Sequence, residues 1–123
     1  MSNANPFDAA SDHFSPTSVP AYRASLLKSV RVPTTELKAG DVVHYHGIKI
    51  SIDSVIAHAK EDIPGGVVVV ASGPVVNADE VAQGEGYLFA EARWLLDHRS
   101  DEEARAGRKS IKGSVMALWD VQR

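Results

Sequence analysis

Residues 37–58 constrain the fold of this 123-residue chain more than any other segment. Gly40 opens the segment as part of a Gly-Asp turn signal, and Gly47 separates two short runs of strand-forming residues. After Gly47, isoleucines alternate with polar residues, which is the period-two pattern of a half-buried strand. The segment therefore predicts a β-hairpin that reverses at Gly47 and carries two closely spaced histidines, His44 and His46.

The remaining pattern is also mainly that of strands. Four consecutive valines at 67–70 predict a buried central strand, and the alternation over residues 115–121 predicts a closing strand. Residues 21–32 fit either a short helix or an entering strand. Residues 88–98 also fit both, and a strand is favoured there because the neighbouring segments are strands. Trp94 and Trp119 are both expected in the core, since each lies on the apolar phase of its segment.

These segments predict a mainly β fold, a small SH3-like or OB-like barrel of about five strands, with one short helix as an option. Residues 21–123 would form this single domain. Residues 1–20 hold three prolines and few large apolar groups, so they predict a flexible tail, with docking through Phe7 and Phe14 as the alternative. The charged residues 99–113 predict a solvated loop or a short helix capped by Ser100.

Composition narrows the function classes. The chain has no cysteine, which excludes disulfides, thiol chemistry and cysteine-based zinc sites. The formal net charge of −3 argues against binding nucleic acid through bulk positive charge, although a local basic patch stays open. No apolar run approaches the roughly 20 residues of a membrane span, and no secretion signal is recognisable. We therefore expect a cytoplasmic protein with no membrane partner and no cofactor.

His44 and His46 are the first candidates for chemistry. Two histidines separated by one residue on a strand point to the same face and can share a metal ion. The carboxylate that metal-binding barrels place a few residues later is missing, since Gly47, Ile48 and Lys49 follow. The favoured interpretation is that Val43 and Tyr45 point inward, and that the two histidines form a surface patch with Lys49.

No spacing of serine, histidine and acid predicts a nucleophile, and no glycine cluster has the sequence of a phosphate loop, so no catalytic residues are assigned. Aromatic side chains such as Tyr45, Tyr87 and Phe89 could stack on bases, with arginines and lysines on the phosphates. The candidate binding residues are His44, Tyr45, His46, Lys49, Arg93, Arg105, Arg108, Lys109 and Lys112.

The L-K-x-G-D-x-V sequence at 37–43 and the W-x-V-Q sequence at 119–122 resemble small β-barrel proteins of phages and other mobile elements. Most of those proteins have no assigned activity, so the resemblance implies a fold and a genomic setting and carries over no functional residue. It also implies the cytoplasm of the host cell as the location.

Three functions follow from this sequence, in decreasing order. The first is a non-enzymatic binding module for a host or phage protein, in host takeover or defence evasion. The second is single-stranded nucleic-acid binding on an OB-like barrel. The third is a metal-dependent enzyme centred on His44 and His46.

Overall fold

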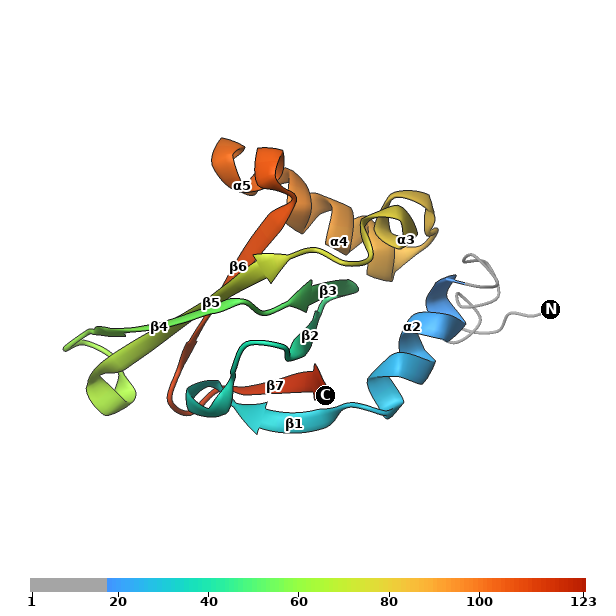
Figure 1. Ribbon diagram of the computed structural model, residues 1–123. Helices are drawn as coiled ribbons and strands as arrows, with labels where there is room; N and C mark the ends of the chain where they lie inside the picture. Colours follow the sequence, from blue (N-terminus) through green and yellow to red (C-terminus); the bar gives the residue numbers. More distant parts are fainter. Residues whose placement is uncertain (1–17) are drawn as a thin grey trace.

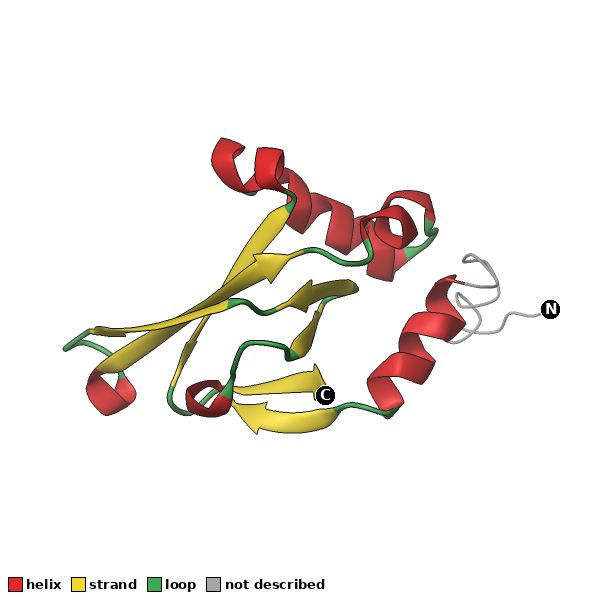
Figure 2. Ribbon diagram, in the orientation of Figure 1, coloured by secondary structure: helices red, strands yellow, loops and turns green. Residues whose placement is uncertain are grey.

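The computed structural model describes residues 18–123, which form seven strands in two antiparallel sheets together with short helices (Figures 1 and 2). The mainly β class is confirmed, with more strands and more helices than the sequence predicts. The strands are β1 (Val30–Pro33), β2 (Val42–Tyr45), β3 (Ile48–Ser51), β4 (Ser54–Ala59), β5 (Val67–Pro74), β6 (Arg108–Ser114) and β7 (Leu118–Gln122). The helices are α2 (Ser18–Leu27), α3 (Ala78–Gln83), α4 (Tyr87–Asp97) and α5 (Asp101–Ala106), with short 3-10 turns at Thr34–Glu36 and Pro64–Gly66.

The first sheet has the strand order β1-β7-β2-β3, so the last strand of the chain lies between two of the earliest. The predicted hairpin is confirmed as β2 and β3, which reverse at His46 and Gly47. Both turn residues have positive φ angles, 49° and 89°, as a two-residue type I′ hairpin turn requires. Val43 and Val121 face each other on the inner side of the sheet and are fully buried.

The second sheet has the order β4-β5-β6. The four valines begin its central strand, β5, as predicted, and Val69 and Ala71 face the core. β4 lies at the edge of this sheet, and in the described part of the chain its outer side has no neighbouring strand. Every residue of β4 except Ser54 is exposed.

A close crossing joins the two sheets. An isolated bridge pairs Ile50 of β3 with Val75, just after β5, and the Asp53 amide donates to the Ser72 carbonyl over 2.9 Å. At Gly73 the two backbones come so close that a Cβ atom would overlap the Ser51 carbonyl oxygen. The core forms around this crossing, from buried residues of both sheets and of α4.

Residues 88–98 form a helix, so the strand prediction for this segment is wrong. Phe89 and Ala92 of α4 are fully buried, whereas Trp94 is 58% exposed and the prediction that it belongs to the core is also wrong. The apolar residues of this segment satisfy the helical and the alternating pattern at once, and packing against the core selects the helix. Trp119, by contrast, is half-buried and packs against the core.

Two other segments contain both alternatives that the sequence leaves open. Residues 21–32 contain the end of α2 and the start of β1, and residues 99–113 contain α5 followed by most of β6. The predicted cap is confirmed, because the Ser100 hydroxyl accepts a hydrogen bond from the Glu103 amide over 3.1 Å. Ile111 of β6 is buried, so the second half of this segment is not solvated.

The predicted tail is shorter than expected, since α2 begins at Ser18. The rest of the tail prediction, including Phe7 and Phe14, lies outside the described residues. Among residues 18–123, no helix is long and apolar enough to cross a membrane.

Candidate functional site

His44 is a buried residue in the middle of the first sheet. It lies on the side opposite to Val43, as the alternation predicts, but α2 covers this side and the His44 side chain is only 6% exposed. Its ring lies 5.3 Å from the Tyr22 ring of α2, and its Nε2 lies 3.1 Å from the Gln122 Oε1. The prediction that His44 belongs to a surface patch is therefore wrong.

His46 lies in the hairpin turn, beyond the end of β2, so it does not share the face of His44. Its Nδ1 lies 3.1 Å from the Glu91 Oε1 of α4, and both side chains are more than half exposed. The described residues contain no group of three histidines or carboxylates placed to hold a metal ion. The geometry thus separates the two residues that the sequence treats as a candidate metal pair.

A pocket opens where β2 and β7 diverge. His44 and Asp120 form the last ladder pair between these strands, and the next residues, Tyr45 and Trp119, no longer pair. The resulting hollow, here called the β2–β7 pocket, has a volume of about 330 Å³. It is lined by Tyr22, Leu26, His44, Tyr45, His46, Gly47, Leu88, Leu118, Trp119 and Asp120.

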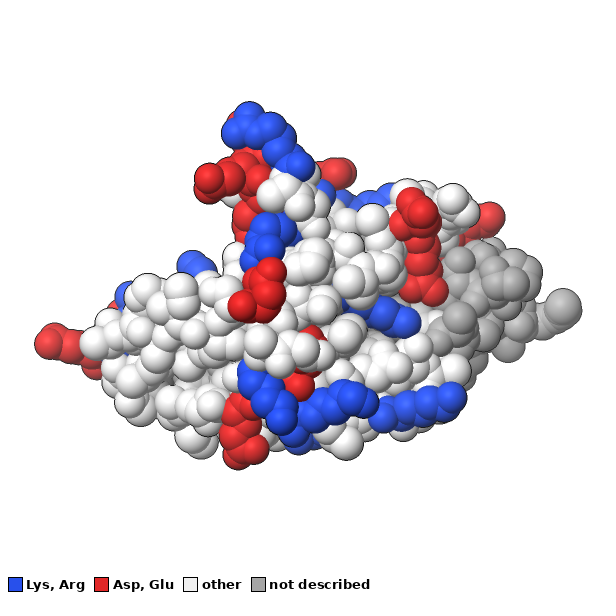
Figure 3. All heavy atoms as spheres, viewed as in Figure 1, with Lys and Arg blue, Asp and Glu red and all other residues white. Residues whose placement is uncertain are grey.

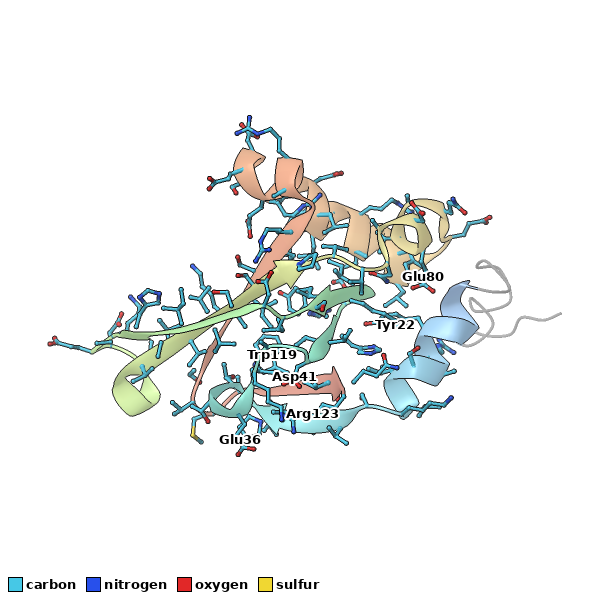
Figure 4. All side chains as sticks on the ribbon, in the orientation of Figure 1. Tyr22, Glu36, Asp41, Glu80, Trp119 and Arg123 are labelled. Atoms are coloured by element: carbon cyan, nitrogen blue, oxygen red, sulfur yellow. The ribbon has the colours of Figure 1, made fainter. Side chains whose placement is uncertain are left out.

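Tyr22 anchors α2 over this pocket and is 3% exposed (Figure 4). Its hydroxyl accepts a hydrogen bond from the Gly47 amide over 3.1 Å, and the Lys49 ammonium lies 5.8 Å from its ring centre. Burial raises the pKa of Tyr22 to about 12, although the Gly47 hydrogen bond opposes the shift. The phenol is therefore neutral at physiological pH and serves to fix α2 against the hairpin turn.

Four polar residues form a row across the face of the first sheet that α2 covers. Cross-strand pairing places Arg31 opposite Asp120, Asp120 opposite His44, and His44 opposite Lys49. Arg31 and Asp120 make an ion pair of 3.5 Å, and the Lys49 ammonium donates to the Ser25 hydroxyl over 3.0 Å. Each charge in the row thus has a local partner.

Burial lowers the pKa of His44 below its ordinary value of 6.5, and nearby Lys49 adds to the effect, while Gln122, Asp120 and Glu80 oppose it. The buried Nδ1 has no hydrogen-bond partner among the described residues. The neutral tautomer with a proton on Nε2 satisfies this arrangement, because Nε2 donates to Gln122 and Nδ1 carries no hydrogen. Protonation would bury an N–H group without an acceptor, which is costly.

A pH dependence of stability follows from this shift. The unfolded chain binds a proton at His44 near pH 6.5, whereas the folded chain resists it, so protonation favours unfolding. We expect the free energy of unfolding to fall as the pH drops below about 7 and to level off below the pKa of the folded state. Urea denaturation of the wild type and of His44→Gln between pH 8 and pH 5 measures this term. Equal slopes for the two proteins would contradict it.

The basic candidates from the second half of the chain do not form one surface. Arg93 donates to the carbonyls of Val81 and Gly84, over 2.9 and 2.6 Å, and so fixes the end of α3. Arg108 pairs with Asp53. Lys109 lies 5.7 Å from the centre of the Tyr45 ring, and burial lowers its pKa.

Arg105 and Lys112 are exposed, on α5 and β6 respectively. A different basic strip follows the lower rim of the molecule, over β1 and the adjoining end of α2 (Figure 3). Its exposed residues include Lys28 and Arg31. The sequence offers no signal for this strip, because its members come from separate segments.

The sequence also did not single out the pocket residues Tyr22, Leu118 and Asp120. The alternation of β7 places Asp120 and Gln122 on one face, which was a usable signal. Their proximity to His44 depends on the pairing of β7 with β2, which no local pattern reveals. Comparison with known proteins finds no matching family model, no matching curated protein and no matching solved structure, so no function comes to this chain from a relative.

Proposed function

We propose that this chain is a non-enzymatic protein-binding module, and that it takes an apolar side chain of its partner into the β2–β7 pocket. The observation that carries the proposal is the lining of the pocket, where side chains of Tyr22, Leu26, Tyr45, Leu88 and Trp119 surround a hollow of about 330 Å³. Buried anchor side chains in such pockets contribute most of the affinity of protein interfaces. Leu118, 55% exposed, adds apolar surface to the lining.

The polar groups of the pocket support binding rather than catalysis. The Nε2 of His44 interacts with Gln122, the Tyr22 hydroxyl accepts from Gly47, and His46 pairs with Glu91. A general base or nucleophile must be within reach of substrate, with a second group to orient it. These side chains instead stabilise the walls. The separation of His44 from His46 removes the main support for a metal-dependent enzyme.

The phage or mobile-element setting and the closed SH3-like or OB-like barrel belong to the same proposal. Both rest on the L-K-x-G-D-x-V and W-x-V-Q resemblance. The partner would then be a host or phage protein, met in the cytoplasm of the host.

Selection of displayed random peptides on the immobilised full chain tests the proposal. We expect selected peptides to share an aromatic or long aliphatic residue. Leu118→Glu should weaken their binding at least about tenfold, because it places a carboxylate beside Asp120 where an apolar group must be buried. Fluorescence anisotropy of a labelled peptide measures the affinity.

Val76→Glu is the matched control. Val76 is 54% exposed and lies outside the pocket lining, so the same change of charge there should leave affinity unchanged. Peptides that bind Leu118→Glu as tightly as wild type, or a selection that yields no binder, would refute the proposal.

Single-stranded nucleic-acid binding is the second candidate, and the basic strip over β1 and α2 favours it (Figure 3). A labelled oligothymidylate should then bind with strong salt dependence, and Lys28→Glu with Arg31→Glu should reduce the salt slope by about 1.4. Arg105→Glu, on α5, is the control for net charge. The absence of binding at low salt would eliminate this function.

A further inference from the structure

The outer edge of β4 is an unprotected strand edge. Within residues 18–123 it has no neighbouring strand, and its sequence S-V-I-A-H-A contains no proline and no Asp, Glu, Lys or Arg. Natural proteins normally protect such edges with charges, prolines or bulges, because exposed N–H and C=O groups pair readily with another strand. Ile56, 52% exposed, adds an apolar side chain to this edge.

The face of the sheet around Ile56 is apolar as well. Ile56 pairs with Val70 and His58 pairs with Val68, so these side chains lie on one face, away from the buried Val69 and Ala71. Val68 and Val70 are half-buried. A strand added at β4 would extend this face.

We propose that the occupant of this edge is β4 of a second copy of the chain, which pairs antiparallel about a two-fold axis at Ile56. Two-fold pairing of identical strands is restricted, because the backbone groups of alternate residues point outward. Each outward-pointing residue must meet another outward-pointing residue, so one residue always lies opposite itself.

Charge selects among the registers that this rule permits. With the axis at Ile56, Val55 faces Ala57 and Ser54 faces His58, so apolar residues meet apolar residues and a hydroxyl meets an imidazole twice. With the axis at Ala57, Asp53 of each copy would face Glu61 of the other, and like charges directly opposite are destabilising. With the axis at Val55, the overlap within β4 shrinks to residues 54–56.

The resulting dimer would contain a continuous sheet with the order β6-β5-β4-β4-β5-β6. Pairing of one short strand buries less than the roughly 800 Å² per partner of a standard interface. The dimer is therefore reversible, and its population rises with protein concentration.

Light scattering and sedimentation across protein concentrations test the association. We expect the average mass of the wild type to rise from 13.2 kDa towards twice that value. Ile56→Lys should raise the dissociation constant at least about tenfold, since two ammonium groups would meet at the axis. Met116→Lys, at a 74% exposed apolar position elsewhere, should have no effect.

The absence of native cysteine allows a direct test of the register. Single variants Val55→Cys, Ile56→Cys and Ala57→Cys are oxidised mildly at a concentration where the wild type dimerises. Ile56→Cys should form a disulfide dimer, because residues on the axis lie within bridging distance. The other two Cα pairs are offset along the strands to about 8 Å, beyond the range of a disulfide.

A wild type that stays monomeric at all concentrations would overturn the proposal. Preferential crosslinking of Val55→Cys or Ala57→Cys would overturn it too, because the axis would then lie elsewhere. Failure here leaves the pocket proposal intact, since the edge of β4 and the β2–β7 pocket share no residue.

Discussion

Replacement of Gly73 by alanine is expected to destabilise this domain by more than about 4 kcal/mol, a loss at the extreme of single substitutions. A Cβ atom at this position would overlap the Ser51 carbonyl oxygen and lie 2.7 Å from the Ser51 carbonyl carbon and 3.1 Å from the Ile52 Cα. All three atoms belong to the backbone, so no side-chain rotation relieves the overlap. The two sheets would have to separate where they cross.

Gly107→Ala is the matched control for this substitution. Gly107 has a φ angle of +68°, and an added Cβ would meet nothing within 4 Å. The expected cost there is the conformational penalty alone, about 1 kcal/mol. Chemical denaturation of both variants measures the difference. Equal losses would mean that the backbones do not approach this closely at Gly73.

Phe89→Ala is expected to cost about 3 to 5 kcal/mol, since it removes a fully buried ring and leaves a cavity. The ring packs edge-on against Tyr22, with centroids 6.2 Å apart, and it lies over Gly84. Its loss would therefore loosen both α4 and the tyrosine that fixes α2. Typical domains have only 5 to 15 kcal/mol of stability, so this variant would approach unfolding.

Trp94→Ala, on the same helix, separates burial from ring size. Trp94 is 58% exposed, and the expected change in the free energy of unfolding is below about 0.5 kcal/mol. Urea denaturation, followed by circular dichroism, measures both variants. If Trp94→Ala were as damaging as Phe89→Ala, the assignment of the buried face of α4 would be wrong.

Local signals in the sequence were sufficient for some elements. Gly47 follows the alternation of β2 and precedes that of β3, so the hairpin was predictable from turn chemistry alone. The Ser100 cap was predictable for the same reason, because the hydroxyl and the amide it accepts from lie three residues apart. Both features depend on contacts between residues that are close in sequence.

Helix α4 and the environment of His44 depend on distant contacts, and both were misjudged. The apolar residues of α4 fit two periods, and only packing against the core decides between them. The alternation placed Val43 inward and His44 on the opposite face correctly. What covers that opposite face is α2, which presents Tyr22 as its buried anchor and has no apolar stripe that would announce the contact.

The position of β7 has a consequence for synthesis of the protein. Because β7 separates β1 from β2, the first sheet cannot assemble until residues 118–122 have left the ribosome. Its pairs join residues as far apart as Val30 and Val121, which favours slow folding. The edges of β1 and β2 therefore stay open during translation, and a chain cut before Leu118 would keep them open permanently. Such a fragment is a substrate for chaperones and proteases rather than a smaller version of the domain.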